Sequence, residues 1–131
     1  MAKLPTKILC DTNFLLVPLR FGVDVFTEAD EALNDLTEFY VSRRVLDEIN
    51  LLRKKAKPSL EKELLFALKM AEQCELIEDK SETQVDDSLI HLAKRHNMVI
   101  GTTDSELRKK ARKEGVKVIY LRQKRYLVLD G

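Results

Sequence analysis

An acid, a hydroxyl residue and an amide directly follow a short apolar run at positions 8–10 of the chain. Asp11, Thr12 and Asn13 end this run abruptly. The pattern is typical of a buried parallel strand that carries polar side chains to the carboxyl edge of its sheet. Ligand sites of open α/β sheets lie at that edge. Asp11 is therefore the first candidate for chemistry, and the question is which other side chains converge on it.

Further acids stand where they could approach Asp11. Asp104 follows an apolar run at 98–100, and Asp86 and Asp87 stand at the expected start of a helix. In a doubly wound sheet, the first and fourth strands are neighbours at the switch point, so Asp11 and Asp104 should lie close together with Asp86 above them. We prefer Asp86 to Asp87 because the apolar residues three, four and seven positions after Asp86 place it on the inward face of the helix.

Glu48 falls on the shoulder of the apolar stripe of a helix expected at 43–56. A carboxylate in that position costs free energy unless it is paired or bound to something. The alternative without a ligand is a side chain that bends to water or pairs with Arg44. Each of the other acids, taken alone, could instead cap a helix or a turn. The expected convergence of four acids on one cleft is what indicates a shared site.

Several carboxylates held a few ångströms apart repel one another, and protons or a cation must relieve that repulsion. No His or Cys set accompanies these acids, and His91 and His96 are expected to have surface roles. A donor set of oxygens alone suits Mg²⁺ or Mn²⁺ rather than Zn²⁺. Such ions lower the pKa of a bound water and can clamp a phosphodiester for in-line attack.

The elements that must position these acids alternate between strand and helix, with two helices between the second and third strands and a loop or broken helical turn at 14–25. Thr103 and Glu106 have the spacing of a capping box for the helix that precedes the fifth strand. The order predicts a parallel sheet with helices on both faces. The expected strands lie at 8–10, 39–41, 74–77, 98–100 and 116–121, with a short edge strand at 126–129.

The composition predicts one domain spanning residues 1–131. An apolar share of 44% suffices for a core, and the 34% of charged residues balance to a net charge of +1, so any basic surface must be local. Cys10 and Cys74 are not in a Cys-x-x-Cys pair, and we expect two buried, reduced thiols. No apolar run approaches the ~20 residues that span a bilayer, so we expect a cytoplasmic protein without a membrane partner.

Four segments, taken in order, resemble PIN-domain nucleases: 8–16, 45–49, 85–93 and 99–119. The resemblance covers nearly the whole chain. It implies a five-stranded parallel sheet in a three-layer α/β/α sandwich and a metal-dependent endoribonuclease that cleaves single-stranded RNA. Carried over residue by residue, the family's acids match Asp11, Glu48, Asp86 (with Asp87 as the alternative) and Asp104, and Asn13 and Thr103 are the expected hydrogen-bonding helpers.

The stretch at 122–126 resembles the branch of PIN proteins that process ribosomal RNA and their archaeal relatives, which implies a ribosomal precursor particle as a partner. The VapC-type toxins share the four acids, and they imply an antitoxin instead. A catalytically silent RNA-binding or scaffold module is a third alternative. Apolar residues around 15–26 would serve a homodimer contact, in keeping with the family's habit. Phosphatases with an aspartyl nucleophile are disfavoured, because they need a second Asp where this chain has Asn13.

Three basic clusters, at 53–57, 108–113 and 122–125, are candidates for contact with RNA phosphates; solvated helix faces and tails are the alternative. Binding through such clusters would weaken steeply with salt. Tyr126 or Phe14 could stack on a base, although each fits the core better. The residues expected to contact RNA are Arg53, Lys54, Arg108, Lys109, Arg112, Lys124 and Arg125.

Overall fold

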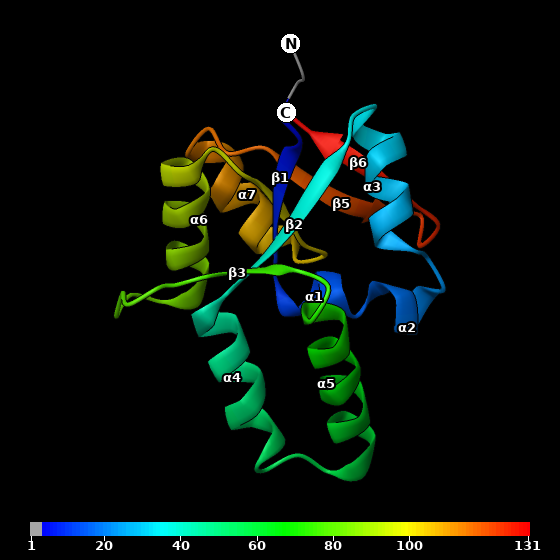
Figure 1. Cartoon of the computed structure of the whole chain (residues 1–131), viewed down its shortest axis with the longest axis vertical. Coiled ribbons are helices and arrows are strands. Elements are labelled where there is room, and N and C mark those ends of the chain that lie inside the picture. The colour runs from blue at the N-terminus through cyan, green and yellow to red at the C-terminus, as the bar shows by residue number, and fades with distance from the viewer. Residues whose placement is uncertain (1–3) are drawn as a thin grey trace.

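A six-stranded sheet forms the centre of the computed structural model, which describes residues 4–131 (Figure 1). The strand order is β3-β2-β1-β4-β5-β6, in which β1 to β5 are parallel and β6 pairs antiparallel with β5. The predicted α/β fold, with five parallel strands and an added edge strand, is confirmed. The strands are β1 (Thr6–Cys10), β2 (Thr37–Ser42), β3 (Glu75–Ile77), β4 (Val99–Gly101), β5 (Val118–Arg122) and β6 (Tyr126–Asp130).

The helices connect these strands and cover both faces of the sheet. Figure 1 shows α4 and α5 as an antiparallel pair that extends beyond the carboxyl end of β1, with α6 and α7 beside each other. Because β1 lies between β2 and β4, its carboxyl end is the switch point at which the strand order reverses. The helices are α1 (Thr12–Leu15), α2 (Val17–Phe21), α3 (Val25–Leu33), α4 (Arg43–Arg53), α5 (Pro58–Ala71), α6 (Val85–His96) and α7 (Ser105–Lys113).

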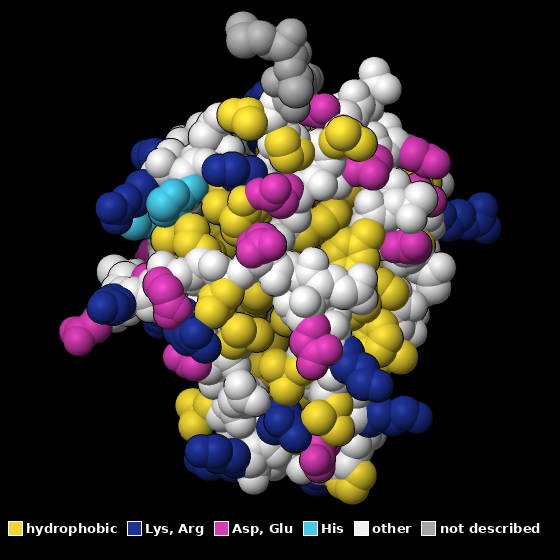
Figure 2. Space-filling view, in the orientation of Figure 1, with side chains coloured by type: hydrophobic (Ala, Val, Ile, Leu, Met, Phe, Trp, Pro, Cys, Tyr) yellow, Lys and Arg dark blue, Asp and Glu magenta, His cyan; other side chains and the backbone are white. Residues whose placement is uncertain are grey.

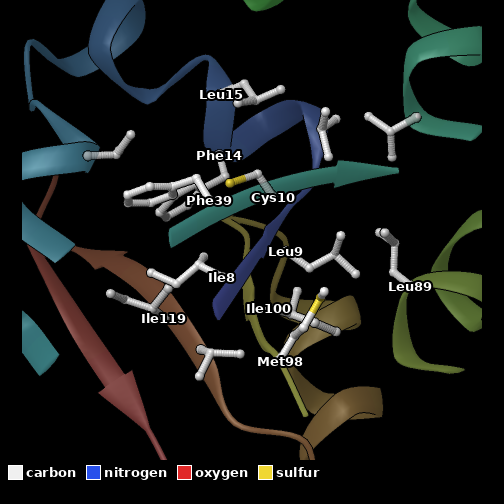
Figure 3. Packing of buried hydrophobic residues seen from close by; sticks show 14 of the residues in the cluster. Ile8, Leu9, Cys10, Phe14, Leu15, Phe39, Leu89, Met98, Ile100 and Ile119 are labelled. Atoms are coloured by element: carbon white, nitrogen blue, oxygen red, sulfur yellow. The ribbon is translucent and has the colours of Figure 1, made fainter. Parts of the chain in front are cut away.

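Side chains of β1 alternate between the two faces of the sheet, as strand geometry requires. Cys10 lies on the same side as Phe14 and Phe39, whereas Leu9 lies on the opposite side toward Leu89 of α6 (Figure 3). The Phe39 ring meets that of Phe26 in α3 edge to face, with ring centroids 4.6 Å apart. Helix α3 therefore covers one face of the sheet and α6 covers the other.

The segment expected to be a loop or broken turn at 14–25 contains two short helices and the start of α3. Gly22 ends α2 with φ of 68°, a left-handed conformation that glycine adopts at little cost. Most apolar side chains of this segment are buried, and only Leu19 and Phe21 among its large ones are exposed, by 43% and 37%. The apolar character proposed for a dimer contact is thus largely used inside the molecule.

Phe14 is fully buried and belongs to the core, as preferred from the sequence. Its ring packs over Gly101, where an added Cβ would lie 2.9 Å from a ring carbon. Gly101 is also the register partner of Cys10, so the absence of a side chain on β4 lets α1 pack closely against the sheet. This packing fixes the chain immediately after Asp11.

Both cysteines are free thiols, as expected, with Cys10 buried and Cys74 partly buried. Burial raises the pKa of the Cys10 thiol well above its ordinary value, so this thiol is a core residue without nucleophilic character. In residues 4–131, no helix combines the length and the apolar content that crossing a membrane would require.

Candidate active site

Asp11 stands at the switch point, only 8% exposed, in the turn that joins β1 to α1. Its Oδ1 accepts a hydrogen bond of 2.8 Å from the backbone N–H of Phe14, which caps α1. Its Oδ2 accepts a hydrogen bond from the hydroxyl of Thr102, which follows β4. Asp11 therefore does cap a helix, which was the alternative to a role in a shared site. Each of its carboxylate oxygens still has a further lone pair for another contact.

Thr102 is the hydroxyl that supports this carboxylate, and it is fully buried. While its O–H donates to Asp11, its oxygen accepts a bond of 3.0 Å from the backbone N–H of Asp104. Thr103, which was expected to be the helper, is exposed. The alternation of β4 contains the signal that was missed, because Thr102 continues the face of Ile100, the partner of Leu9.

Asp104, and not Thr103, is the N-cap of α7, so the predicted capping box is wrong by one residue. Oδ1 of Asp104 accepts a bond of 2.9 Å from the N–H of Glu106. The physical reason is the buried Thr102, which is held on Asp11 and brings Asp104 to the first free N–H groups of the helix. The second oxygen of Asp104 has no hydrogen bond within residues 4–131.

Asp86 and Asp87 lie inside the first turn of α6, whose N-cap Gln84 makes no side-chain cap bond. Neither acid is therefore the cap, and both gain from the positive end of the helix dipole. The two differ in their partners. Asp87 is exposed and forms an ion pair of 3.7 Å with Lys110. Asp86 is partly buried, and its charge acts on Asp11.

The pKa of Asp11 is raised from 3.8 to about 7. Burial is the largest cause, because it disfavours the charged form. The hydrogen bonds from Thr102 and Phe14 oppose the shift, and the charges of Asp104 and Asp86 add to it. The pKa of Asp86 is raised as well, first by burial and then by Asp104. At this edge of the sheet, the charge of Asp104 thus acts on Asp11 and on Asp86, and the charge of Asp86 acts on Asp11.

Glu48 is exposed on α4 and makes no hydrogen bond or ion pair with any described residue from 4 to 131. Arg44, its expected partner, donates instead to the hydroxyl of Ser81 and the carbonyl of Thr83. The charges that raise the pKa of Asp11 are those of Asp104 and Asp86, and Asp104 also acts on Asp86. Three of the four predicted acids are therefore linked electrostatically, whereas Glu48 is exposed.

The donor set at this edge consists of carboxylate oxygens, which suit Mg²⁺ or Mn²⁺. Within the described part of the chain, no three His, Cys, Asp or Glu side chains lie close enough to hold an ion by themselves. Mg²⁺ commonly uses only one or two carboxylates and completes its shell with waters and substrate phosphates. The residues fit an open site of that kind and do not fit a closed protein cage. His91 and His96 are exposed, as expected.

Asn13 does not contact the acids. Its Oδ1 accepts a long hydrogen bond of 3.5 Å from Arg20, whose guanidinium also binds Glu63 of α5 through two bonds of 3.2 Å. The pKa of Glu63 is lowered by this pairing. Sequence reasoning missed Arg20, because nothing in its local pattern indicates a partner on α5. Its contact holds the Asn13 amide on the side of Arg20 and Glu63.

Some of the residues predicted to contact RNA already bind other side chains of the protein, whereas others form no ion pair within residues 4–131. Arg108 packs on the Tyr120 ring at 4.0 Å and, with Arg112, pairs with Asp130. These two arginines connect α7 to β6, in which Asp130 lies. Arg53 is partly buried with an unpaired Nε, near the end of α4 and α5 where Figure 2 shows several Lys and Arg side chains. The exposed cations without an ion pair in residues 4–131 include Lys54, Lys109, Lys124 and Arg125.

Replacing Thr102 by Val is expected to lower the free energy of unfolding by about 1–2 kcal/mol, because it leaves the N–H of Asp104 without its acceptor. It should also raise the pKa of Asp11 further, since one hydrogen bond to the carboxylate is lost. Urea unfolding at pH 7 measures the first effect. Thr102→Ser retains the hydroxyl and should stay near wild type, as should Thr103→Val at an exposed position. Equal losses in the two valine variants would contradict the assignment.

Comparisons with known proteins agree with this geometry. The chain matches the family described as "PIN like domain" over residues 8–124. Ribonuclease VapC4 of Methanocaldococcus jannaschii is 29% identical over 128 residues, which are 95% of this chain and 97% of that protein. Ribonuclease VapC9 of Archaeoglobus fulgidus is 29% identical over 127 residues, or 95% and 91% of the two chains.

Solved structures show the same fold. The PIN domain endonuclease Utp24 superposes with a TM-score of 0.79 at 22% identity, over 96% of this chain and 92% of that chain. A domain of a functionally unknown protein from Methanocaldococcus jannaschii gives a TM-score of 0.65 at 14% identity, over 89% and 91% of the two chains. At such identities the likeness establishes the fold alone.

Proposed function

Because the chain belongs to the PIN-like domain family, we propose that it is a divalent-cation-dependent endoribonuclease that cleaves single-stranded RNA. The observation that carries the proposal is that the charges of Asp86 and Asp104 act on Asp11, and the charge of Asp104 on Asp86, at the switch point of the sheet. The two relatives named as ribonucleases support it, since each aligns with nearly the whole chain.

Asp11, Asp86 and Asp104 are the acids proposed to hold Mg²⁺ or Mn²⁺, one or two of them directly and the others through waters of the ion. Asp86 is preferred to Asp87, whose carboxylate is paired with Lys110. Glu48 is the proposed fourth acid, because its exposed and unpaired carboxylate is free to turn toward a substrate-bound ion. When bound, the cation supplies positive charge against the phosphodiester and a water of lowered pKa for in-line attack.

The chain itself supplies rigidity at Asp11. Both carboxylate oxygens are held by donors on different elements, the N–H of Phe14 in α1 and the hydroxyl of Thr102 after β4. A ligand fixed in this way does not have to be ordered when substrate binds. With a pKa of about 7, Asp11 is partly protonated near neutral pH, so binding of a cation there releases a proton.

For contact with the RNA backbone, we propose the exposed cations Lys54, Lys109, Lys124 and Arg125, which form no ion pair in residues 4–131. Arg108 and Arg112 are left out, because their guanidinium groups already bind Asp130. Contacts to phosphates carry no sequence information, so they would position the strand without selecting bases.

A cleavage assay on end-labelled single-stranded RNA tests the proposed function. Cleavage is expected with Mn²⁺ or Mg²⁺ and should disappear when EDTA removes the cation. Duplex RNA and single-stranded DNA of the same sequence serve as controls and should be cut more slowly. Undiminished cleavage in EDTA would contradict the proposed cation. RNA binding without cleavage in any metal would favour the alternative of a catalytically silent RNA-binding module.

Two roles are compatible with this activity, and each implies a partner. Processing of a ribosomal precursor is favoured by the residues at 122–126, whereas a VapC-type activity under an antitoxin is favoured by the two VapC relatives. Expression of the wild type in a heterologous host separates the roles. Growth arrest that Asp11→Asn abolishes supports the toxin, and unaffected growth with cleavage of precursor ribosomal RNA at defined positions supports processing.

A further inference from the structure

The turn between β5 and β6 lies at the same edge of the sheet as the acids, because β5 runs parallel to β1 and β4. The strand β5 extends to Arg122, three residues beyond Ile119, which is the register partner of Gly101 at the end of β4. The hairpin therefore projects past the carboxyl edge at which Asp11 and Asp104 stand. Figure 1 shows the turn that joins β5 and β6 at the right-hand margin of the view, below α3.

Strand alternation places two side chains of this hairpin on the side of the sheet that α7 covers. Arg108 of α7 packs on Tyr120, so Tyr120 faces α7. Arg122 lies two residues further along the same face, and its antiparallel register partner is Tyr126. Directly opposed residues of an antiparallel pair share a face. Arg122 and Tyr126 thus form a cross-strand pair on the α7 side, displaced from Tyr120 toward the carboxyl edge.

Asp11 and its hydrogen-bond partner Thr102 lie on the same side of the sheet as Tyr120, the side that α7 covers. Thr102 continues the face of Ile100, which is in register with Val118 of β5, and Val118 shares its face with Tyr120. Asp11 is bonded to Thr102 on that face. Helix α7 itself begins at the edge, one helical turn before Arg108, with its N-cap Asp104. The Arg122–Tyr126 pair and the carboxylates therefore border one surface.

The Arg122–Tyr126 pair is exposed, and the cations of the hairpin form no ion pair within residues 4–131. Tyr126 has 39% of its surface exposed although it stands in a strand. Arg122, Lys124 and Arg125 are exposed, and none of them forms an ion pair within residues 4–131. This contrasts with Arg108 and Tyr120, which already pack on each other. The hairpin presents an aromatic ring and three unpaired cations with no acid among them.

The conformation of the turn also indicates a functional role for the hairpin. Three residues separate the register partners Arg122 and Tyr126, and the N–H of Arg125 donates a bond of 3.1 Å to the carbonyl of Arg122. The central residues of this β-turn, Gln123 and Lys124, have φ of 53° and 57°, the positive values that a type I′ turn requires. Asn-Gly is the sequence that adopts this turn most easily, whereas Gln and Lys are strained in the left-handed region. The left-handed backbone at Lys124 lowers the stability of the turn, so stability does not explain why a cation stands at this position.

We propose that Arg122 and Tyr126 form a stacking subsite for one nucleotide of single-stranded RNA, a few nucleotides from the phosphate at the acids, with Lys124 and Arg125 on the adjoining phosphates. The proposal rests on the proposed ribonuclease function. Bases of single-stranded RNA stack on tyrosine rings and on arginine planes whatever their identity, because every base has a π face. The subsite therefore selects unpaired RNA over duplex and has little base preference.

Binding of a fluorescein-labelled single-stranded RNA of about 12 nucleotides, measured by anisotropy in EDTA, tests the subsite without cleavage. Tyr126→Leu should raise the dissociation constant by about fivefold to a hundredfold. Tyr126→Phe is the matched control, since it retains the ring, and should bind as the wild type does. Lys124→Gln, at a residue proposed to contact a phosphate, should reduce the dependence of log K on log salt by about one unit, whereas Tyr126→Leu should leave that slope unchanged.

RNA that carries one abasic nucleotide separates stacking from a structural role of Tyr126. At one position along the strand, the abasic change should weaken binding by the wild type as much as Tyr126→Leu does, and should have no further effect in the variant. Equal binding by the wild type and Tyr126→Leu, or effects that add at every abasic position, would overturn the subsite. Cleavage by the wild type in Mn²⁺ is scored separately. Cleavage without Tyr126-dependent binding refutes only the subsite, and Tyr126-dependent binding without cleavage refutes only the nuclease.

Discussion

Replacing Asp11 by Asn is expected to reduce the cleavage rate of single-stranded RNA at least about a hundredfold while the fold is retained. Asn is isosteric with Asp and can still accept the hydrogen bond from the N–H of Phe14. It carries no charge, so it cannot help to hold a divalent cation against the RNA phosphate. Initial rates under saturating Mn²⁺, with circular dichroism to verify the fold, measure the effect.

Asp87→Asn is the matched control for this loss. Asp87 is exposed, paired with Lys110 and adjacent in sequence to Asp86, so its replacement should leave cleavage within a few-fold of the wild type. Asp86→Asn should instead resemble Asp11→Asn. If Asp87→Asn proved to be the inactive variant, the choice between the two acids would be reversed. Cleavage that survives Asp11→Asn unchanged would remove the acids at the switch point from the mechanism altogether.

The second large effect concerns stability against pH in protein free of divalent cations. The pKa of Asp11 is about 7 in the folded chain against 3.8 as the ordinary value, so the folded state keeps a proton that the unfolded state has already lost. Stability falls with rising pH wherever the folded state binds more protons. The free energy of unfolding should therefore decrease between about pH 4 and pH 7, by up to about 4 kcal/mol from this group. The raised pKa of Asp86 acts in the same direction.

Asp11→Asn should largely abolish that decrease, because an amide does not ionise in this range. In EDTA at pH 8, the variant should be more stable than the wild type by roughly 2–4 kcal/mol, and the difference should vanish near pH 4. Urea unfolding at both pH values measures this. Mn²⁺ should stabilise the wild type and leave the variant unaffected. Parallel pH curves for the two proteins would contradict the raised pKa of Asp11.

The features that the sequence predicted well are those set by short-range pattern. The apolar run before Asp11 predicted β1, and the order of strands predicted that β1 and β4 are neighbours. The inward placement of Asp86 followed from helical periodicity. These predictions succeeded because the alternation of a strand and the period of a helix fix which face a residue occupies.

The features that the sequence could not supply depend on register and on long-range partners. The choice between Thr102 and Thr103 requires the end of β4 to be known to one residue, which composition does not give. Arg108 and Arg112 form part of a basic run, yet Asp130, far along the chain, binds both. Glu48 was expected on the shoulder of the apolar stripe of α4, but Leu51 and Leu52 beside it are themselves exposed, so the buried stripe is narrower than the periodicity indicated.

A crystal structure of the wild-type protein in Mn²⁺, with an anomalous difference map, is the most direct test of the proposed cation site. The expected result is an anomalous peak about 2 Å from a carboxylate oxygen of Asp11 and from an oxygen of Asp86 or Asp104. Waters should complete the shell of the ion, because these side chains do not form a closed cage. A structure at saturating Mn²⁺ with no peak at this edge of the sheet, while RNA cleavage still requires the ion, would contradict it.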